Sequence, residues 1–379
     1  MNFDLSEDQR ALKSTVERLM SREYSFESRA KHATQTNGWS ETAWKQYADI
    51  GLLGMSFSEA DGGFGGGPVE QMIAMEAFGR SLVLEPFVAS IVLSGGLLRH
   101  GANDEMRARL VPSLVDGSLR LAFAHSEPGV RYNLADVSTT AHNKVGEWCI
   151  TGHKALCLHG DSANALLVSA RVHGMQRDES GIAVFRVEAG AAGVKRQSYQ
   201  LLDGSRAADV VFDNAAAELI IPPERGLAAI ERTCDEAIGA LAAEAVGAMA
   251  VLHSMTVEYL KTRKQFGVPI GSFQALQHRA VDMLVTLEQA RSMAMFAAMA
   301  VVETDPVELA KASSAVKVQI GRSSRFISQQ AIQLHGGIGM ALECQAGHYV
   351  RRLMVIESLL GDADFHLQRL ARLGGLIEP

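Results

Sequence analysis

Cysteine is scarce in this sequence, and its four residues stand apart. They are Cys149, Cys157, Cys234 and Cys344, with no CxxC pair among them. This spacing argues against a disulfide framework and a thiolate metal site, and it indicates a reducing compartment. The twelve histidines form no HxH or HxxxH pair, so the sequence predicts no metal site.

Basic residues are outnumbered, with 36 Lys and Arg against 43 Asp and Glu, which gives a net charge of −7. A non-specific nucleic-acid binder would need a basic face, so no nucleic-acid partner is expected. No uncharged apolar run reaches about 18 residues, and the closest, Ala237–Leu252, contains Glu244. The polar, acidic start MNFDLSEDQR predicts no signal peptide. We therefore expect a cytoplasmic protein without a membrane partner.

Hydrophobic residues make up 47% of the chain and charged residues 21%, which allows large cores. At roughly 150 residues per domain, the length indicates two or three domains. Helical spacing dominates the first third, over Glu41–Leu53, Val69–Gly79, Pro86–His100 and Asp104–Val115. Residues 1–118 are therefore predicted to form an N-terminal α-helical domain.

Short runs rich in Val, Ile, Leu and Phe follow over residues 119–222, separated by Gly, Asp and Asn. They are Leu119–Ala124, Glu147–Thr151, Ala165–Ala170, Ile182–Val187 and Asp209–Phe212. Their lengths are typical of strands, and no helical pattern intervenes, so a Rossmann fold is not expected. The sequence predicts a middle β domain that is a small antiparallel barrel or sandwich.

Long helices are predicted for residues 223–379. One covers about Gly226–Thr262, the next Phe273–Glu303, and the last Tyr349–Leu373. Between these, a helix begins at Asp305-Pro306, a cap residue before a first-turn proline, and ends at Gly336-Gly337. Four long helices with short loops predict a four-helix bundle, so the fold class is α+β in three domains.

One polar segment begins at Arg263 and ends at Gln274, with the sequence RKQFGVPIGSFQ. It places a basic cluster after a long helix and before a tight Gly/Pro turn. The Arg263 guanidinium could donate two parallel hydrogen bonds to a pyrophosphate, with Gln265 and Gln274 adding neutral ones. The residues alone leave a second interpretation open, in which the cations complement the carboxyl end of the helix dipole.

Two further segments have the same two interpretations. Gln333–Gly339 (QLHGGIG) places adjacent glycines after a helix, which permits close approach to a ligand or simply caps the helix. Ala122–Gly129 (AFAHSEPG) ends the first strand, where the Ser126 hydroxyl could meet a planar ligand or merely begin a turn.

Together, R-x-Q-F-G-x-P-I-x-x-F-Q and the later Q-x-H-G-G-x-G resemble the acyl-CoA dehydrogenase family. The order of helices, strands and helices fits that family over nearly the whole chain. The segments Gly361–His366 (GDADFH) and Leu121–Glu127 make one subtype the most similar. This subtype is the small subunit of pimeloyl-CoA dehydrogenase-like heteromeric enzymes.

The resemblance implies a tetrameric, FAD-dependent enzyme that dehydrogenates the α and β carbons of an acyl-CoA and passes electrons to an acceptor such as electron-transfer flavoprotein. In the family, a Glu carboxylate removes the α-proton while hydride passes to the flavin. Motif matching gives these residues for a neighbour's FAD: Arg263, Gln265, Phe266, Phe273, Gln274, Gln333, His335, Gly336 and Gly337. Ser126 would face the flavin ring of its own chain.

The sequence departs from the family at the catalytic base. Where the family has Glu before the glycine of Y-E-G-T, this chain has Leu360, and leucine cannot accept a proton. A second family position for the base matches Ala237, beside Glu236, and Glu357 lies one turn before Leu360. Either glutamate is a candidate for a displaced base, and an ion-paired or solvated side chain is the plainer interpretation of each. The catalytic residue is therefore unknown from the sequence.

A second departure lies where the family has W-[IV]-[TS] beside the flavin. Here Leu156-Cys157-Leu158 follows Gly152-His153-Lys154, so an aromatic wall and a hydroxyl are missing. The groups for the ADP half of a neighbour's FAD are intact. The hypothesis that follows is one subunit of an α2β2 dehydrogenase whose partner subunit supplies the base.

Three alternatives stay open at this point. The chain could be a self-sufficient homotetramer with a displaced Glu base, a flavin-dependent oxidase or hydroxylase, or a catalytically silent structural partner subunit. Degradation of fatty or dicarboxylic acids is the expected role, with the acyl chain length unspecified.

Overall fold

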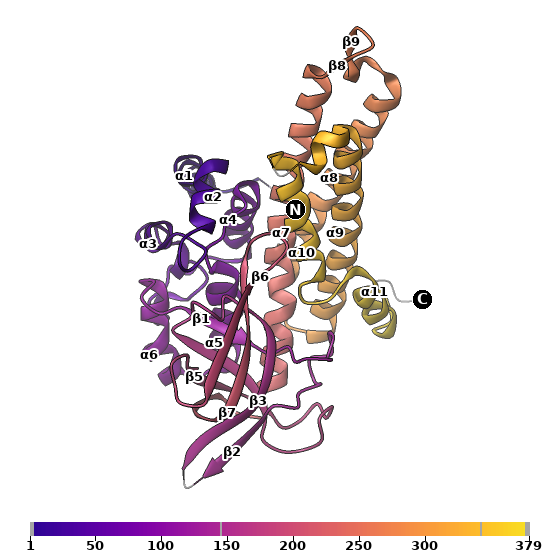
Figure 1. Cartoon of the computed structure of the whole chain (residues 1–379). Coiled ribbons are helices and arrows are strands. Elements are labelled where there is room, and N and C mark those ends of the chain that lie inside the picture. The colour runs from indigo at the N-terminus through magenta and orange to yellow at the C-terminus, as the bar shows by residue number, and fades with distance from the viewer. Residues whose placement is uncertain (1–3, 145, 342, 376–379) are drawn as a thin grey trace. The chain divides into compact units, whose positions relative to one another are not determined.

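The computed structural model describes residues 4–144, 146–341 and 343–375 (Figure 1). The chain divides into two compact units. The first comprises Met1–Ala30, Pro68–Val83 and Ile238–Pro379, and the second comprises Lys31–Gly67 and Leu84–Ala237.

Helices build the first unit. They are α1 (Glu7–Glu23), the start of α2 (Phe26–Ala33), α4 (Pro68–Ser81), most of α7 (Gly226–Thr262), α8 (Gln274–Ala300), α9 (Pro306–His335), α10 (Gln345–Ser358) and α11 (Ala363–Arg372). The short helices η4 (Ile270–Ser272) and η5 (Gly336–Met340) connect them. A hairpin of β8 (Lys264–Gln265) and β9 (Val268–Pro269) lies where α7 ends and α8 begins (Figure 1).

Local signals set the ends of α1 and α9. The Ser6 hydroxyl accepts from the Gln9 amide N–H at 3.1 Å, and the Gln9 side chain accepts from the Ser6 N–H at 3.0 Å. This reciprocal pair is a capping box. Asp305 caps α9 by accepting from the Val307 N–H at 2.8 Å, and α9 ends at Gly336, whose φ is 61°. Both ends of α9 are thus where the sequence predicts them.

Glycine lets α4 and α7 approach closely. A Cβ added to Gly79 would lie 1.9 Å from the Glu244 carbonyl oxygen, and one added to Gly247 would lie 2.0 Å from the Glu76 carbonyl oxygen. Both contacts are to backbone, which cannot rotate away.

In the described chain, α7 is also long and apolar enough to cross a membrane, but 67% of its most apolar window is buried inside the protein, as in a core helix.

The prediction of one helix over Tyr349–Leu373 is wrong. The chain breaks between α10 and α11, where Leu360 and Gly361 have φ of 58° and 107°. These left-handed values cannot continue an α-helix. Asp362 then caps α11 by accepting from the Phe365 N–H at 2.8 Å.

The second unit combines helices with a sheet. Its helices are α3 (Glu41–Asp49), η1 (Leu52–Gly54), η2 (Glu59–Asp61), the π-helical η3 (Val88–Ser94), α5 (Gly95–Gly101) and α6 (Asp104–Val115). Its strands are β1 (Leu121–Ala124), β2 (Thr140–Lys144), β3 (Glu147–Leu158), β4 (Ala165–Arg171), β5 (Ile182–Glu188), β6 (Val194–Gln200) and β7 (Arg206–Ile221).

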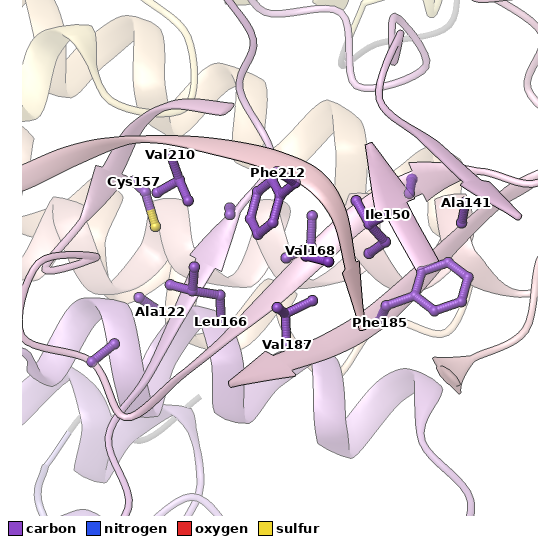
Figure 2. Packing of buried hydrophobic residues seen from close by; sticks show 14 of the residues in the cluster. Ala122, Ala141, Ile150, Cys157, Leu166, Val168, Phe185, Val187, Val210 and Phe212 are labelled. Atoms are coloured by element: carbon purple, nitrogen blue, oxygen red, sulfur yellow. The ribbon is translucent and has the colours of Figure 1, made fainter. Parts of the chain in front are cut away.

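The strands form one barrel-like sheet in the order β1-β4-β2-β3-β7-β5, with β5 pairing back to β4 and β6 pairing with β7. Apolar side chains from facing strands fill its interior, among them Leu166, Val168, Phe185 and Phe212, as Figure 2 shows. The predicted barrel is confirmed, except that β1 and β2 pair with β4 in parallel.

Two strands were not expected from the sequence. β2 and β6 are largely exposed and polar, so they lack the apolar alternation that identifies a strand. β3 and β7 are also longer than predicted, because each continues past a bulge or a run of alanines where the hydrophobic pattern fades.

Candidate functional site

The hairpin after α7 is an exposed feature of the first unit. Phe266 and Gly267, at its tip, have φ of 56° and 82°, the two left-handed residues of a type I′ turn. The ring of Phe266 is 91% exposed and meets Phe273 edge to face at 6.2 Å. The Ile270 N–H donates to the Arg263 carbonyl at 2.8 Å and closes the base of the hairpin.

Polar side chains on this hairpin are available to a ligand. Arg263 and Gln274 are exposed, and within the described ranges neither has an ion pair or a hydrogen bond through its side chain. In the described part of the chain, the Gln265 side-chain amide donates to the neighbouring Lys264 carbonyl, at 2.8 Å. The predicted pyrophosphate-binding groups therefore face solvent.

The second predicted segment lies beside the first. The ring of His335, at the end of α9, stacks on Tyr259 of α7 with centroids 4.6 Å apart and planes 24° apart. The Tyr259 carbonyl also accepts a hydrogen bond from the Arg263 N–H at 2.8 Å. The ends of α7 and α9 are thus joined, and the two motifs that are distant in sequence form one surface.

Glycines leave open space at the backbone of this surface. A Cβ added to Gly336 or Gly337 would meet nothing within 4 Å, and Gln333 is exposed. His335 itself is buried, and its Nδ1 donates to the Ala331 carbonyl at 2.8 Å. Open backbone beside exposed Arg263 fits a diphosphate, while His335 holds the two segments together.

The third predicted segment lies in the second unit, at the end of β1. Ser126 is half-buried, and its carbonyl accepts from the Ala155 N–H at 2.8 Å. Directly after Ala155, β3 bulges, and Leu156 takes a φ of 53° with 38% of its side chain exposed. Its N–H donates to the Tyr199 hydroxyl at 3.1 Å and to Asp209 at 3.2 Å. Leu156 is thus the partly exposed residue at the position where the resemblance implies an aromatic one.

Cys157 does not replace the missing hydroxyl. Its thiol is buried and contacts the Phe123 carbonyl at 3.5 Å. Burial raises the pKa of Cys157 to about 12, and the charge of Asp161 adds to the rise. The side chain is therefore a neutral thiol directed into the barrel.

The position of the family base holds no proton acceptor. Leu360 sits in the left-handed turn, and its carbonyl accepts from His366 Nε2 at 2.9 Å. The buried Lys317 ammonium donates to the Ile356 and Leu359 carbonyls at 2.5 and 2.7 Å. Lys317 thus fixes the end of α10 from another helix, a role that the sequence pattern did not reveal.

Glu236 is engaged by cations of the second unit. Its Oε2 lies 2.8 Å from His100 Nε2 and 3.2 Å from Arg99, and its Oε1 accepts from Arg232 Nε at 3.0 Å. Burial raises the pKa of Glu236, but His100 and both arginines lower it to a net value below the ordinary one. A base for a weak carbon acid needs the opposite shift.

Glu357 has the shift that a base needs. Burial raises its pKa. The hydrogen bond from the Ala363 N–H at 3.3 Å and the positive charges of Lys317 and Arg325 lower the pKa, but they offset the effect of burial only in part. Its Oε2 is buried without a hydrogen bond in the described residues. That oxygen faces α9, since a Cβ at Gly321 would lie 2.1 Å from it.

Family models cover almost the whole chain. The N-terminal domain of acyl-CoA dehydrogenase matches residues 6–118, the middle domain 122–215 and the C-terminal domain 224–374. This chain belongs to the acyl-CoA dehydrogenase family. Its members are FAD-binding oxidoreductases that act on acyl-CoA thioesters, and FAD is the cofactor. Within the described residues no group of His, Cys, Asp and Glu could hold a metal ion.

Similar proteins span this chain nearly end to end. Acryloyl-CoA reductase (NADH) of Anaerotignum propionicum is 27% identical, over 98% of this chain and 95% of its own. Acyl-CoA dehydrogenase FadE12 of Mycobacterium tuberculosis is 30% identical, over 90% and 89%. The structure of a variant of the Tcur3481-Tcur3483 steroid ACAD is 30% identical, with a TM-score of 0.87 over 97% of each chain.

Proposed function

We propose that this chain is one subunit of an α2β2 acyl-CoA dehydrogenase and binds the ADP half of an FAD whose flavin ring lies in its partner. The observation that carries the proposal is an asymmetry. The hairpin and the Gly336-Gly337 opening are formed and exposed, whereas Leu360 leaves the base position without a proton acceptor. The similarity to the Tcur3481-Tcur3483 steroid ACAD supports it.

The chain's own residues have defined tasks in this proposal. Arg263 donates paired hydrogen bonds to the diphosphate, and Gln265 and Gln274 add neutral ones. The open backbone at Gly336 and Gly337 allows the nucleotide to approach closely. Bound FAD supplies the hydride acceptor. In this proposal a carboxylate of the partner removes the α-proton, because Leu360 occupies the family's base position and Glu236 is held in ion pairs.

Turnover and FAD content of the purified chain test this proposal. The chain alone should turn over acyl-CoA poorly, and adding the partner subunit should restore activity. The active complex should then contain half as many FAD molecules as protein chains. Arg263→Gln should lower the affinity of the complex for FAD about tenfold or more, because a charged hydrogen bond is lost. Arg279→Gln, on the exposed face of α8, is the matched control. Full activity of the pure chain would overturn the proposal.

A self-sufficient homotetramer is the second candidate, and the raised pKa of Glu357 favours it. In that case Glu357→Gln should abolish flavin reduction by substrate in the pure chain. Under the heteromer proposal, the same variant in the complex should reduce flavin at the wild-type rate.

We also propose the finer assignments that follow from the resemblance. The chain is a subunit like the small subunit of pimeloyl-CoA dehydrogenase, and its substrate is a fatty or dicarboxylic acyl-CoA. Its electron acceptor is electron-transfer flavoprotein, and its location is cytoplasmic. The three-domain division 1–118, 119–222 and 223–379 belongs with them. Comparing linear and ω-carboxyl acyl-CoA substrates of matched length in the complex tests the substrate class.

A further inference from the structure

A cavity of about 190 Å³ lies in the first unit, where α11 packs against α9 (Figure 1). Charged and polar side chains line it around one aromatic ring, and the lining residues are Arg322, Arg325, Phe326, Gln329, Ala363 and Asp364. Sites for cofactors and drug-sized ligands usually enclose about 300–1,000 Å³. This cavity is therefore too small for a dinucleotide and has room for a few side chains.

The two arginines of the cavity have unused hydrogen-bond donors. Arg322 is exposed, and in the part of the chain that the structure describes its side chain has no ion pair and no hydrogen bond. Arg325 is 64% exposed, and its Nη2 lies 3.7 Å from Glu357 Oε1, which is beyond hydrogen-bond distance. Gln329 is also exposed, and among the described residues its side chain has no hydrogen bond. The cavity thus offers several free N–H groups to an acceptor.

A carboxylate is the acceptor that fits these donors best. The lining side chains carry two positive charges and one negative charge, that of Asp364 in the first turn of α11. Guanidinium groups bind carboxylates through paired N–H donors, and such charged hydrogen bonds are about twice as strong as neutral ones. Glu357 offsets the charge of Arg325 in part, whereas Arg322 has no counter-charge in the described chain. The cavity therefore suits an acidic side chain that another polypeptide supplies.

The cavity lies on the same face of α9 as Gln333, one of the residues proposed to bind the nucleotide. Arg322, Arg325, Gln329 and Gln333 follow one another at steps of three and four residues, which place side chains on one side of a helix. The helix rises about 16 Å between the first and the last of them. A stable interface buries about 800 Å² on each partner, which corresponds to a patch about 30 Å across. A chain seated over Gln333 therefore also reaches Arg322.

We propose that this cavity receives an acidic side chain of the partner subunit, whose carboxylate is held by Arg322 and Arg325. The identity of the occupant rests on the proposed function, because there the chain that covers Gln333 is the partner that holds the flavin ring. A competing chain without that carboxylate would leave Arg322 desolvated and unpaired, which weakens its binding. The cavity thus determines which chain pairs with this face and takes no part in catalysis.

Charge reversal of Arg322 tests the contact. Because Arg322 has no partner within the described chain, Arg322→Glu should leave the thermal unfolding of the isolated chain unchanged. The dissociation constant for the partner subunit should rise about a hundredfold or more, because an attractive charge pair becomes a repulsive one. Lys13→Glu, at an exposed position of α1, makes the same change in charge and is the matched control. Equal dissociation constants for wild type and Arg322→Glu in analytical ultracentrifugation would overturn the proposal.

Zero-length cross-linking of the complex identifies the occupant. Arg322→Lys keeps the charge and supplies an amine, and combining it with Asp364→Asn leaves no carboxylate of this chain in the lining. A carbodiimide joins an amine to a carboxylate that it touches. Mass spectrometry should then find position 322 joined to an Asp or Glu of the partner subunit. Links from position 322 only to this chain or to a second copy of it would overturn the proposal.

FAD affinity separates this inference from the proposed function. At partner concentrations that keep the complex assembled, Arg322→Glu should bind FAD as tightly as wild type does. A weaker affinity there would make the cavity part of the nucleotide site and would refute the inference. If Arg322→Glu impairs assembly but Arg263→Gln leaves FAD binding unchanged, the proposed function alone is wrong. A wild-type chain that forms no complex would overturn both.

Discussion

Replacing Gly247 by alanine should separate α4 from α7. The new Cβ would lie 2.0 Å from the Glu76 carbonyl oxygen, 2.9 Å from its carbon and 3.0 Å from the Arg80 amide nitrogen. All three atoms are backbone, so the helices must part by about 1 Å at the crossing to bring the shortest contact to even 3.0 Å. Overpacking of this kind costs about 1–3 kcal/mol or more, and alanine's better helix propensity returns about 1 kcal/mol.

Gly239 on the same helix provides a matched control. A Cβ there would meet only the Ala297 methyl group at 3.4 Å, an ordinary contact. Gly239→Ala should therefore stabilise the fold by about 0.5–1 kcal/mol. The gain in helix propensity is common to both variants, so we expect their free energies of unfolding to differ by the overpacking cost of about 1–3 kcal/mol, with Gly247→Ala the less stable. Urea unfolding followed by circular dichroism measures this, and equal midpoints for both variants would refute the close-packing argument.

Three further outcomes follow from the charges and thiols. Glu236→Gln should lower the free energy of unfolding by about 3 kcal/mol, the cost of breaking a buried ion pair. Activity per folded complex should stay at the wild-type level. A large loss of that activity would instead identify Glu236 as the base. Burial raises the pKa of Glu127, but Lys154 and the hydrogen bonds outweigh it and bring it to about 2. Stability due to Glu127 is thus complete above about pH 4.5 and lost towards pH 2, and Glu127→Gln should flatten this acid limb in pH-dependent unfolding. At pH 8 a thiol reagent should modify the half-buried Cys149 and Cys344 and spare Cys157, which mass spectrometry of the labelled peptides would reveal.

Local sequence signals account for the elements that the sequence predicts correctly. The helix that follows Asp305 has its cap, its first-turn proline and its terminal glycine within the sequence itself, so both ends are predictable. The break at Leu360 depends instead on Lys317, which reaches the end of α10 from another helix. No pattern near Leu360 reports that contact, and leucine is an uncommon residue at positive φ.

The candidate site shows the same division between local and distant causes. The residues of the hairpin and of the glycine pair could be identified from their motifs. Their meeting depends on the stacking of Tyr259 on His335, which no spacing rule predicts. The buried ion pair between Lys154 and Glu127, at 2.7 Å, escaped prediction for a different reason. Lys154 stands in a strand pattern like an outward-facing polar residue, and only the closed sheet places it inside.

The exposed tip of the hairpin has a consequence for biosynthesis. Because the left-handed turn at Phe266 and Gly267 is formed within one chain, a newly folded copy displays its aromatic ring to water before it meets any other protein. In the proposed heteromer, copies made in excess of the partner subunit would keep Phe266, Val268 and Phe273 exposed together, and a group of exposed apolar side chains favours association between copies. If that proposal holds, matched production of the two subunits would limit such association.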